Sequence, residues 1–162
     1  MIRKTINSIL FISVLVILAI NCSRSKNVIF TDSAIMPNAV WRLTDNPDFR
    51  IIVNDTTTRT NVFFNIRTGS AYPFRNIWLF VTATSPDGKT NVTDTLQYDL
   101  ADEKGKWYGR GFGDIHELKL PYRQNVFFPA KGTYHFKIQH GMRITDLKGV
   151  YDISVRVEKT GR

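Results

Sequence analysis

Hydrophobic side chains recur at every second residue over most of the chain, and this alternation limits the folds that the chain can adopt. Phe49, Ile51 and Val53 alternate with polar residues, and the same period returns in later segments. The clearest of these segments lie at 62–66, 77–83, 92–98, 134–138 and 151–157. Because successive side chains of a strand point to opposite faces of a sheet, this period predicts half-buried strands. The best candidate for helix is one short turn around Met142 to Leu147.

Turn-forming residues separate the alternating runs. The segment Ser85–Lys89 contains Pro86 and Gly88, and it is expected to join its flanking strands as a hairpin. Proline fixes one backbone angle there, and glycine supplies a positive one. Similar segments lie at 103–106 and 129–132. Roughly seven or eight short strands with such turns indicate a two-sheet antiparallel β-sandwich, jelly-roll or immunoglobulin-like. The predicted fold class is all-β.

A length of 162 residues favours one domain. The chain is 43% hydrophobic and 12% aromatic, which is too apolar for a disordered protein. No internal repeat or low-complexity segment divides it. We expect a single β-sandwich domain over residues 28–159.

The first residues have the pattern of an exported protein. Arg3 and Lys4 form a short basic start, and an apolar stretch of 12 residues, Ile9–Ile20, follows with one serine in it. A membrane-spanning helix needs about 20 apolar residues. A basic start before a shorter apolar core is typical of a signal peptide. We expect this peptide to occupy residues 1–21.

Cys22 follows the apolar stretch and resembles the cysteine of a bacterial lipobox, which is acylated and becomes the first residue of the mature chain. Ala19, Ile20 and Asn21 depart from the usual lipobox residues. Cys22 is the only cysteine, so no internal disulfide can form. Acylation would consume its thiol, and residues 22–27 would then form a polar, basic tether. The alternative is a cysteine at the end of an uncleaved anchor helix.

The charge of the chain bears on its partners. The net charge is +8, and the two basic residues of the signal peptide leave +6 on the mature chain. This excess is spread along the sequence and suits anionic lipid headgroups or anionic glycans. No arginine-rich run or nucleic-acid motif is present, so a nucleic-acid partner is not expected.

Residue types that carry catalysis are present without their usual spacing. The histidines are His116, His135 and His140. None has a metal-ligand spacing, and no nucleophile elbow is found. Asp114 and Glu117 are close in sequence, but an acid–base pair requires two carboxylates at a defined separation across a cleft. We therefore expect no enzyme, no metal site, no cofactor and no small-molecule substrate.

A glycine-rich segment at residues 105–115 is the most unusual part of the chain. Alternating glycines let a backbone bend or approach a neighbour closely. Trp107, Tyr108 and Arg110 are of types enriched at binding hot spots, and Asp114 lies near the end of the segment. Two interpretations follow. The segment is either a connection whose aromatic residues fold onto the sandwich edge, or a loop that binds a protein partner.

Four ordered blocks carry a resemblance to a known family: Tyr72–Phe80, Pro86–Leu96, Leu100–Ile115 and Gly141–Asp152. Together they resemble the gliding-motility lipoproteins of the GldH family of Bacteroidetes, over residues 27–159. The resemblance implies a non-catalytic outer-membrane lipoprotein, acting as a component or assembly factor of the gliding and type IX secretion machinery. Other envelope proteins would then be its partners. Relatives also occur in bacteria that do not glide, so a general envelope-biogenesis role is the alternative.

The resemblance also bears on which side of the outer membrane the protein occupies. Surface lipoproteins of Bacteroidetes tend to carry acidic residues just after the lipidated cysteine, and none follows Cys22. We therefore expect the periplasmic face. A glycan-binding module remains a second hypothesis, because sandwiches often bind sugars. That hypothesis predicts an aromatic platform, at Trp78 or Trp107, on an exposed face.

Overall fold

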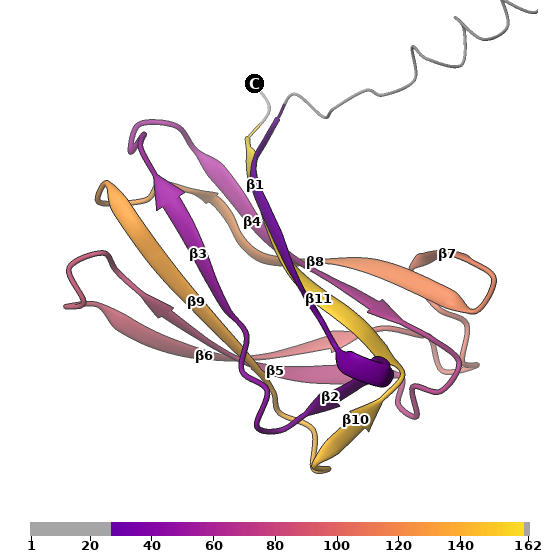
Figure 1. Cartoon of the computed structure of the whole chain (residues 1–162). Coiled ribbons are helices and arrows are strands. Elements are labelled where there is room, and N and C mark those ends of the chain that lie inside the picture. The colour runs from indigo at the N-terminus through magenta and orange to yellow at the C-terminus, as the bar shows by residue number, and fades with distance from the viewer. Residues whose placement is uncertain (1–26, 161–162) are drawn as a thin grey trace, which may run out of the picture.

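The computed structural model describes residues 27–160, and within them the fold is all-β and antiparallel, as the alternation predicted (Figure 1). The described part contains no α-helix and a single short 3₁₀ turn. In chain order the elements are β1 (Val28–Ile35), η1 (Pro37–Ala39), β2 (Val40–Arg42), β3 (Asp48–Val53), β4 (Thr60–Thr68), β5 (Asn76–Thr84), β6 (Asn91–Asp99), β7 (Arg110–Phe112), β8 (Ile115–Val126), β9 (Gly132–His140), β10 (Asp146–Lys148) and β11 (Val150–Lys159).

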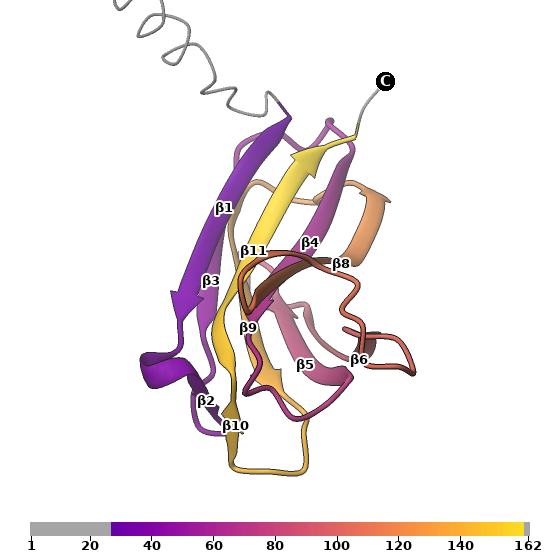
Figure 2. The same cartoon turned by 90° about the vertical axis from the view of Figure 1, so that its right-hand side faces the viewer.

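Two large sheets face each other across the core. One is five-stranded, in the order β1-β11-β4-β8-β7, and the other is four-stranded, in the order β3-β9-β5-β6. The short strands β2 and β10 pair with each other in a separate ladder. Figure 2 shows the five-stranded sheet running beside the four-stranded one, with the β2–β10 ladder at the lower end.

Strand β5 shows how the alternation builds the core. Ile77, Leu79 and Val81 are fully buried, whereas Trp78 and Phe80 between them are partly exposed on the outer face. Each fully buried side chain of this size stabilises the fold by roughly 1.5–3 kcal/mol. The alternation of β5 is therefore confirmed, and the same pattern holds in β3 and β9.

The helical turn expected around Met142 to Leu147 is wrong. The chain bends there and then forms β10, in which Leu147 pairs with Trp41 of β2. Both of these side chains are fully buried. Burial decides the local structure here. A helical turn would leave the buried Trp41 and Leu147 without the strand pairing that brings them together.

The strand registers define two ends of the domain. At one end, Lys159 pairs with Thr60, which in turn pairs with Val126, and the Lys159 amide donates to the carbonyl of Asn27. We call this the terminal end; it also holds the connections 54–59, 85–90 and 127–131. We call the opposite end the distal end; it holds η1, β2, β10, the connections 69–75 and 100–109, and the turn at 113–114.

Candidate interaction surface

The glycine-rich segment forms a hairpin at the distal end. Strand β7 pairs with the start of β8, with Arg110 opposite Glu117 and Phe112 opposite Ile115. Gly113 and Asp114 make the two-residue turn between them, and Gly113 has a φ of 65°. Such a positive angle in a tight hairpin is favourable for glycine. Strand β7 is thus the short edge strand of the five-stranded sheet.

The other glycines of the segment allow close backbone approach. A Cβ atom on Gly109 would collide with the side chain of Leu118 and with the carbonyl of Glu117. A Cβ on Gly111 would collide with the carbonyl of Ile115. The sequence spacing thus matches a strand that lies tightly against β8, which no larger residue would permit.

Trp107 packs into the molecule rather than standing free. Its ring stacks on His116 with centroids 5.2 Å apart and planes 13° apart, and it meets Tyr72 edge-on at 6.1 Å. Its backbone forms an isolated bridge with Ala101. Trp107 therefore joins the 100–109 connection to the root of the hairpin, and it packs against the main hydrophobic core.

The remaining residues of the segment face solvent. Tyr108, Arg110 and Asp114 are exposed, and Tyr108 and Arg110 line a shallow hollow with Leu118. The structure adds Phe112, which is 96% exposed near the hairpin tip and was not singled out from the sequence. The available signal was its position between two glycines, at the end of a strand too short to fold an aromatic ring back onto the core.

The outer face of the five-stranded sheet next to the hairpin carries hydrogen-bonded polar and charged side chains. Glu117 accepts a hydrogen bond from Asn65 at 3.1 Å, and Lys119 donates to Glu158 at 2.7 Å. Burial raises the pKa of Glu158, but the hydrogen bonds from Lys119 and Arg156 outweigh it, and the pKa lies below its usual value. These pairs fix the strands beneath the hairpin in register.

The histidines and acids considered for catalysis lie in separate environments. His116 stacks on Trp107, His135 lies 2.9 Å from a carboxylate oxygen of Asp48, and His140 is buried edge-on against Trp41. Asp114 sits in the hairpin turn while Glu117 bonds to β4. Among residues 27–160, no three His, Cys, Asp or Glu side chains are grouped as metal ligands would be.

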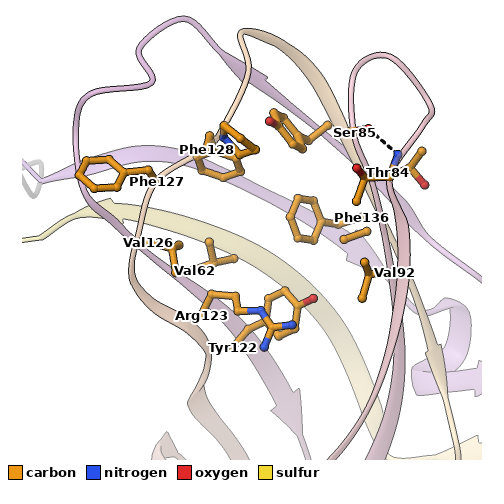
Figure 3. Close-up of a pocket in the computed structure, with 14 residues that line it drawn as sticks. Val62, Thr84, Ser85, Val92, Tyr122, Arg123, Val126, Phe127, Phe128 and Phe136 are labelled. Carbon is orange, nitrogen blue, oxygen red and sulfur yellow. Dashed lines mark hydrogen bonds between the residues drawn. The ribbon is translucent and has the colours of Figure 1, made fainter.

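An apolar cleft opens between the two sheets at the terminal end (Figure 3). It has a volume of about 300 Å³ and is lined mainly by aromatic and aliphatic side chains, including Val62, Val92, Phe127, Phe128 and Phe136. Figure 3 shows Val62, Val92, Phe128 and Phe136 coming from both sheets around a common space, with Phe127 at its outer edge. The sequence gave no indication of this cleft, because its residues come from five separate segments.

Hydrogen bonds and an ion pair between β6 and β8 connect the two sheets beside the cleft. The hydroxyl of Tyr122 and the guanidinium of Arg123, both on β8, donate to one carboxylate oxygen of Asp94 on β6, at 2.6 and 2.7 Å. The hydroxyl of Tyr98 donates to the carbonyl of Pro121 at 2.8 Å. Burial raises the pKa of Tyr98 to about 12, so it remains a donor across the physiological range.

A second aromatic surface lies on the outer face of the four-stranded sheet. Trp78 is 38% exposed, and with Phe80 and Arg143 it lines a hollow beside Gly141. A Cβ on Gly141 would approach both aromatic residues to about 3.1 Å, so glycine keeps this hollow open. Of the two tryptophans considered as a platform, Trp78 is the one on an open sheet face.

The predicted lipidation site, Cys22, lies outside the described residues, as does the expected signal peptide. No helix in the part of the chain that the structure describes is long and apolar enough to cross a membrane.

The chain matches known proteins over nearly all of this domain. The GldH lipoprotein family matches residues 28–157. A gliding motility lipoprotein GldH homolog of Christiangramia forsetii is 36% identical over 127 residues, which cover 74% of this chain and 78% of that protein. The gliding motility lipoprotein GldH of Flavobacterium johnsoniae is 34% identical over 150 residues, which cover 88% and 91%. No solved structure matches this chain. The family match spans the core strands and the hairpin alike, and the chain belongs to the GldH lipoprotein family.

Proposed function

We propose that this protein is a non-catalytic envelope lipoprotein that serves as a component or assembly factor of the gliding motility and type IX secretion machinery. The observation that carries the proposal is the family match, which extends over both sheets and the distal hairpin. Removal of residues 1–21 would leave acylated Cys22 as the anchor, residues 22–27 as the tether and residues 28–159 as the domain. The absence of acid after Cys22 supports the periplasmic face of the outer membrane.

The distal hairpin is the surface that we assign to a protein partner. Tyr108, Arg110, Phe112 and Asp114 stand exposed on it, while Trp107 holds its root in place. An aromatic ring that is solvated in the free protein gains roughly 1.5–3 kcal/mol when a partner buries it. Arginine and tyrosine beside it add the hydrogen-bonding rim of a typical hot spot.

We also infer that the two-sheet domain is a jelly roll rather than an immunoglobulin-like sandwich. The eight long strands pair in a nested way: β1 with β11, β3 with β9, β4 with β8, and β5 with β6. First pairs with last, second with second-last, and so inward, as in one long hairpin rolled into two sheets. This nesting brings both chain termini to a single end.

In-cell crosslinking tests the partner surface. A photoreactive amino acid at Phe112 is expected to capture envelope proteins, and the same probe at Lys137, on the outer face of β9, serves as the control. Phe112→Ala combined with Arg110→Ala should remove protein partners that co-purify with the wild-type lipoprotein. The proposal is contradicted if the double variant is folded and retains every partner.

Glycan binding is a second candidate, favoured by the open aromatic hollow at Trp78. An exposed indole beside an arginine suits an anionic sugar. Titration calorimetry with soluble peptidoglycan fragments would show binding that is lost in Trp78→Ala and kept in Phe112→Ala. Absence of heat with the wild-type protein rules this candidate out for that glycan. In a bacterium that does not glide, the same lipoprotein would serve envelope biogenesis more generally.

A further inference from the structure

The terminal end of the domain carries a cluster of exposed apolar side chains. Ile29 of β1 is 46% exposed, Ile52 of β3 is 64% exposed, and Phe127 after β8 is 45% exposed. Ile29 and Ile52 line one hollow of about 220 Å³ together with Phe128, which also lines the apolar cleft. Phe128 therefore joins the two hollows into one surface.

Basic residues border this surface. In the described chain, the connections of the terminal end and the last two residues of β11 carry four basic residues, Arg59, Lys89, Lys131 and Lys159, against three acidic ones, Asp55, Asp87 and Glu158. The Arg59 guanidinium lies over the Phe127 ring, 4.4 Å from its centroid. This places a cation directly above an exposed apolar group.

The two acids of the connections are occupied by their own turns, and Glu158 accepts hydrogen bonds from Lys119 and Arg156. Asp55 accepts hydrogen bonds from the hydroxyls of Thr57 and Thr58, and these bonds hold its pKa far below the usual range. Asp87 accepts from the hydroxyl of Ser85, which lowers its pKa. Both carboxylates are thus directed into their loops, and the basic side chains set the character of the outer surface.

The length of the chain between Cys22 and β1 limits how far the terminal end can lie from the lipid anchor. Four residues lie between Cys22 and Asn27, and the five steps that join them reach at most roughly 18 Å when the chain is fully extended. An acylated Cys22 lies at the lipid headgroups. The terminal end, where Asn27 bonds to Lys159, is therefore the part of the domain nearest the membrane.

We propose that the terminal end is a lipid-docking face: Ile29, Ile52 and Phe127 enter the interface, and Arg59, Lys131 and Lys159 contact anionic headgroups. Apolar tips inside a basic border match the chemistry of such an interface. The inference rests on the proposed lipidation and deepens it. Strand β4 spans nine residues, or roughly 30 Å, so a docked domain would hold the distal hairpin well away from the bilayer.

The chain is well suited to a direct test, because acylation leaves it without a free thiol and a single new cysteine can be labelled. The full-length lipoprotein is prepared as Ile52→Cys and, as the matched control, Phe112→Cys, each carrying a polarity-sensitive fluorophore. Both are reconstituted in vesicles of phosphatidylethanolamine with phosphatidylglycerol, and in vesicles of phosphatidylcholine. Flotation and the mass of the N-terminus report anchoring separately.

The label at residue 52 is expected to show blue-shifted emission and roughly twofold quenching by brominated lipid in the anionic vesicles, while the label at residue 112 stays unshifted. Replacing Arg59, Lys131 and Lys159 by glutamine should abolish the shift. Replacing Lys104, Lys106 and Lys148 at the distal end should leave it intact.

Three results would overturn the inference. If the protein floats and the label at residue 52 stays as polar as the label at residue 112, the anchor stands and the docking face does not exist. If the shift is equally large in the phosphatidylcholine vesicles, the basic residues do not contact anionic headgroups and the proposed basic border is wrong. If the wild-type chain does not float and retains residues 1–21, lipidation fails and the docking face fails with it.

Discussion

The two ends of the domain both expose hydrophobic side chains, but they differ in how the core beneath them is closed. At the distal end, the β2–β10 ladder seals the sheets over the fully buried Trp41 and Leu147. At the terminal end, the sheets stand apart around an apolar cleft of about 300 Å³. The distal end therefore supports a fixed hairpin, whereas the terminal end offers a broad apolar rim. The exposure of hydrophobic side chains therefore does not distinguish the two ends. Their position relative to the N-terminus of the domain does.

The largest effect is expected from removing the buried side chain of Trp41 at the distal end. Trp41→Ala deletes a fully buried indole whose N–H donates to the Asp45 carbonyl at 2.7 Å. It should destabilise the fold by about 3–5 kcal/mol, measured by urea unfolding. Phe127→Ala at the terminal end is the matched control, and we expect it to cost about 1 kcal/mol or less. Equal losses would show that the two ends are closed alike.

A smaller effect is expected when the hairpin is pushed off β8. Gly109→Ala places a methyl group against Leu118 and the Glu117 carbonyl, which should cost about 1–3 kcal/mol and reduce crosslinking from residue 112. Gly105→Ala meets open space and strains only its backbone, at a φ of 80°. It should therefore retain crosslinking. If the two variants capture partners equally, a close fit of the hairpin is not needed for binding.

The stability of the packing around Trp41 and His140 at the distal end should also depend on pH. Burial lowers the pKa of His140 from its ordinary value of 6.5, so the folded state binds its proton less readily than the unfolded chain does. Stability is then complete above pH 6.5 and is lost as the pH falls below it. His140→Leu should flatten this loss below about pH 6.5, whereas His135→Gln, at an exposed site, should keep it. An unchanged profile in His140→Leu would assign the loss to another group.

The smallest effect on stability belongs to the residue with the largest expected effect on binding. Phe112→Ala removes a ring that is 96% exposed, so the free energy of unfolding should change by about 0.5 kcal/mol or less. Captured partners should fall strongly in the same variant. Loss of fold together with partners would mean that Phe112 packs in a way that the structure does not show.

The alternation in the sequence was enough to predict the all-β class and the strand that became β5, and Pro86 and Gly88 predicted the turn at Ser85–Lys89. Strand β8 was not predicted, because Pro121 interrupts it. In the structure, Pro121 lies opposite Phe63, beside a shift in register and beyond the reach of β7, so its missing N–H breaks no ladder bond. That tolerance depends on which strands are neighbours, which no local pattern contains.

The candidate surface was predicted in part for a similar reason. Residue type identified the glycine-rich segment, but only the fold separates Trp107, which packs on His116, from Tyr108 and Arg110, which face solvent. Phe112 resembles a core residue in the sequence, and it is exposed because a two-residue turn leaves it no core to reach. The terminal-end surface comes from strands far apart in the chain, so no sequence window shows it.

The central claim is that the domain stands on its terminal end and presents its distal hairpin to proteins. Photocrosslinking in intact cells, from a probe at Ile52 and from the same probe at Phe112, tests this most directly. The account predicts lipid adducts from residue 52 and protein adducts from residue 112. Protein adducts from residue 52 together with lipid adducts from residue 112 would contradict it, because the domain would then lie the other way round.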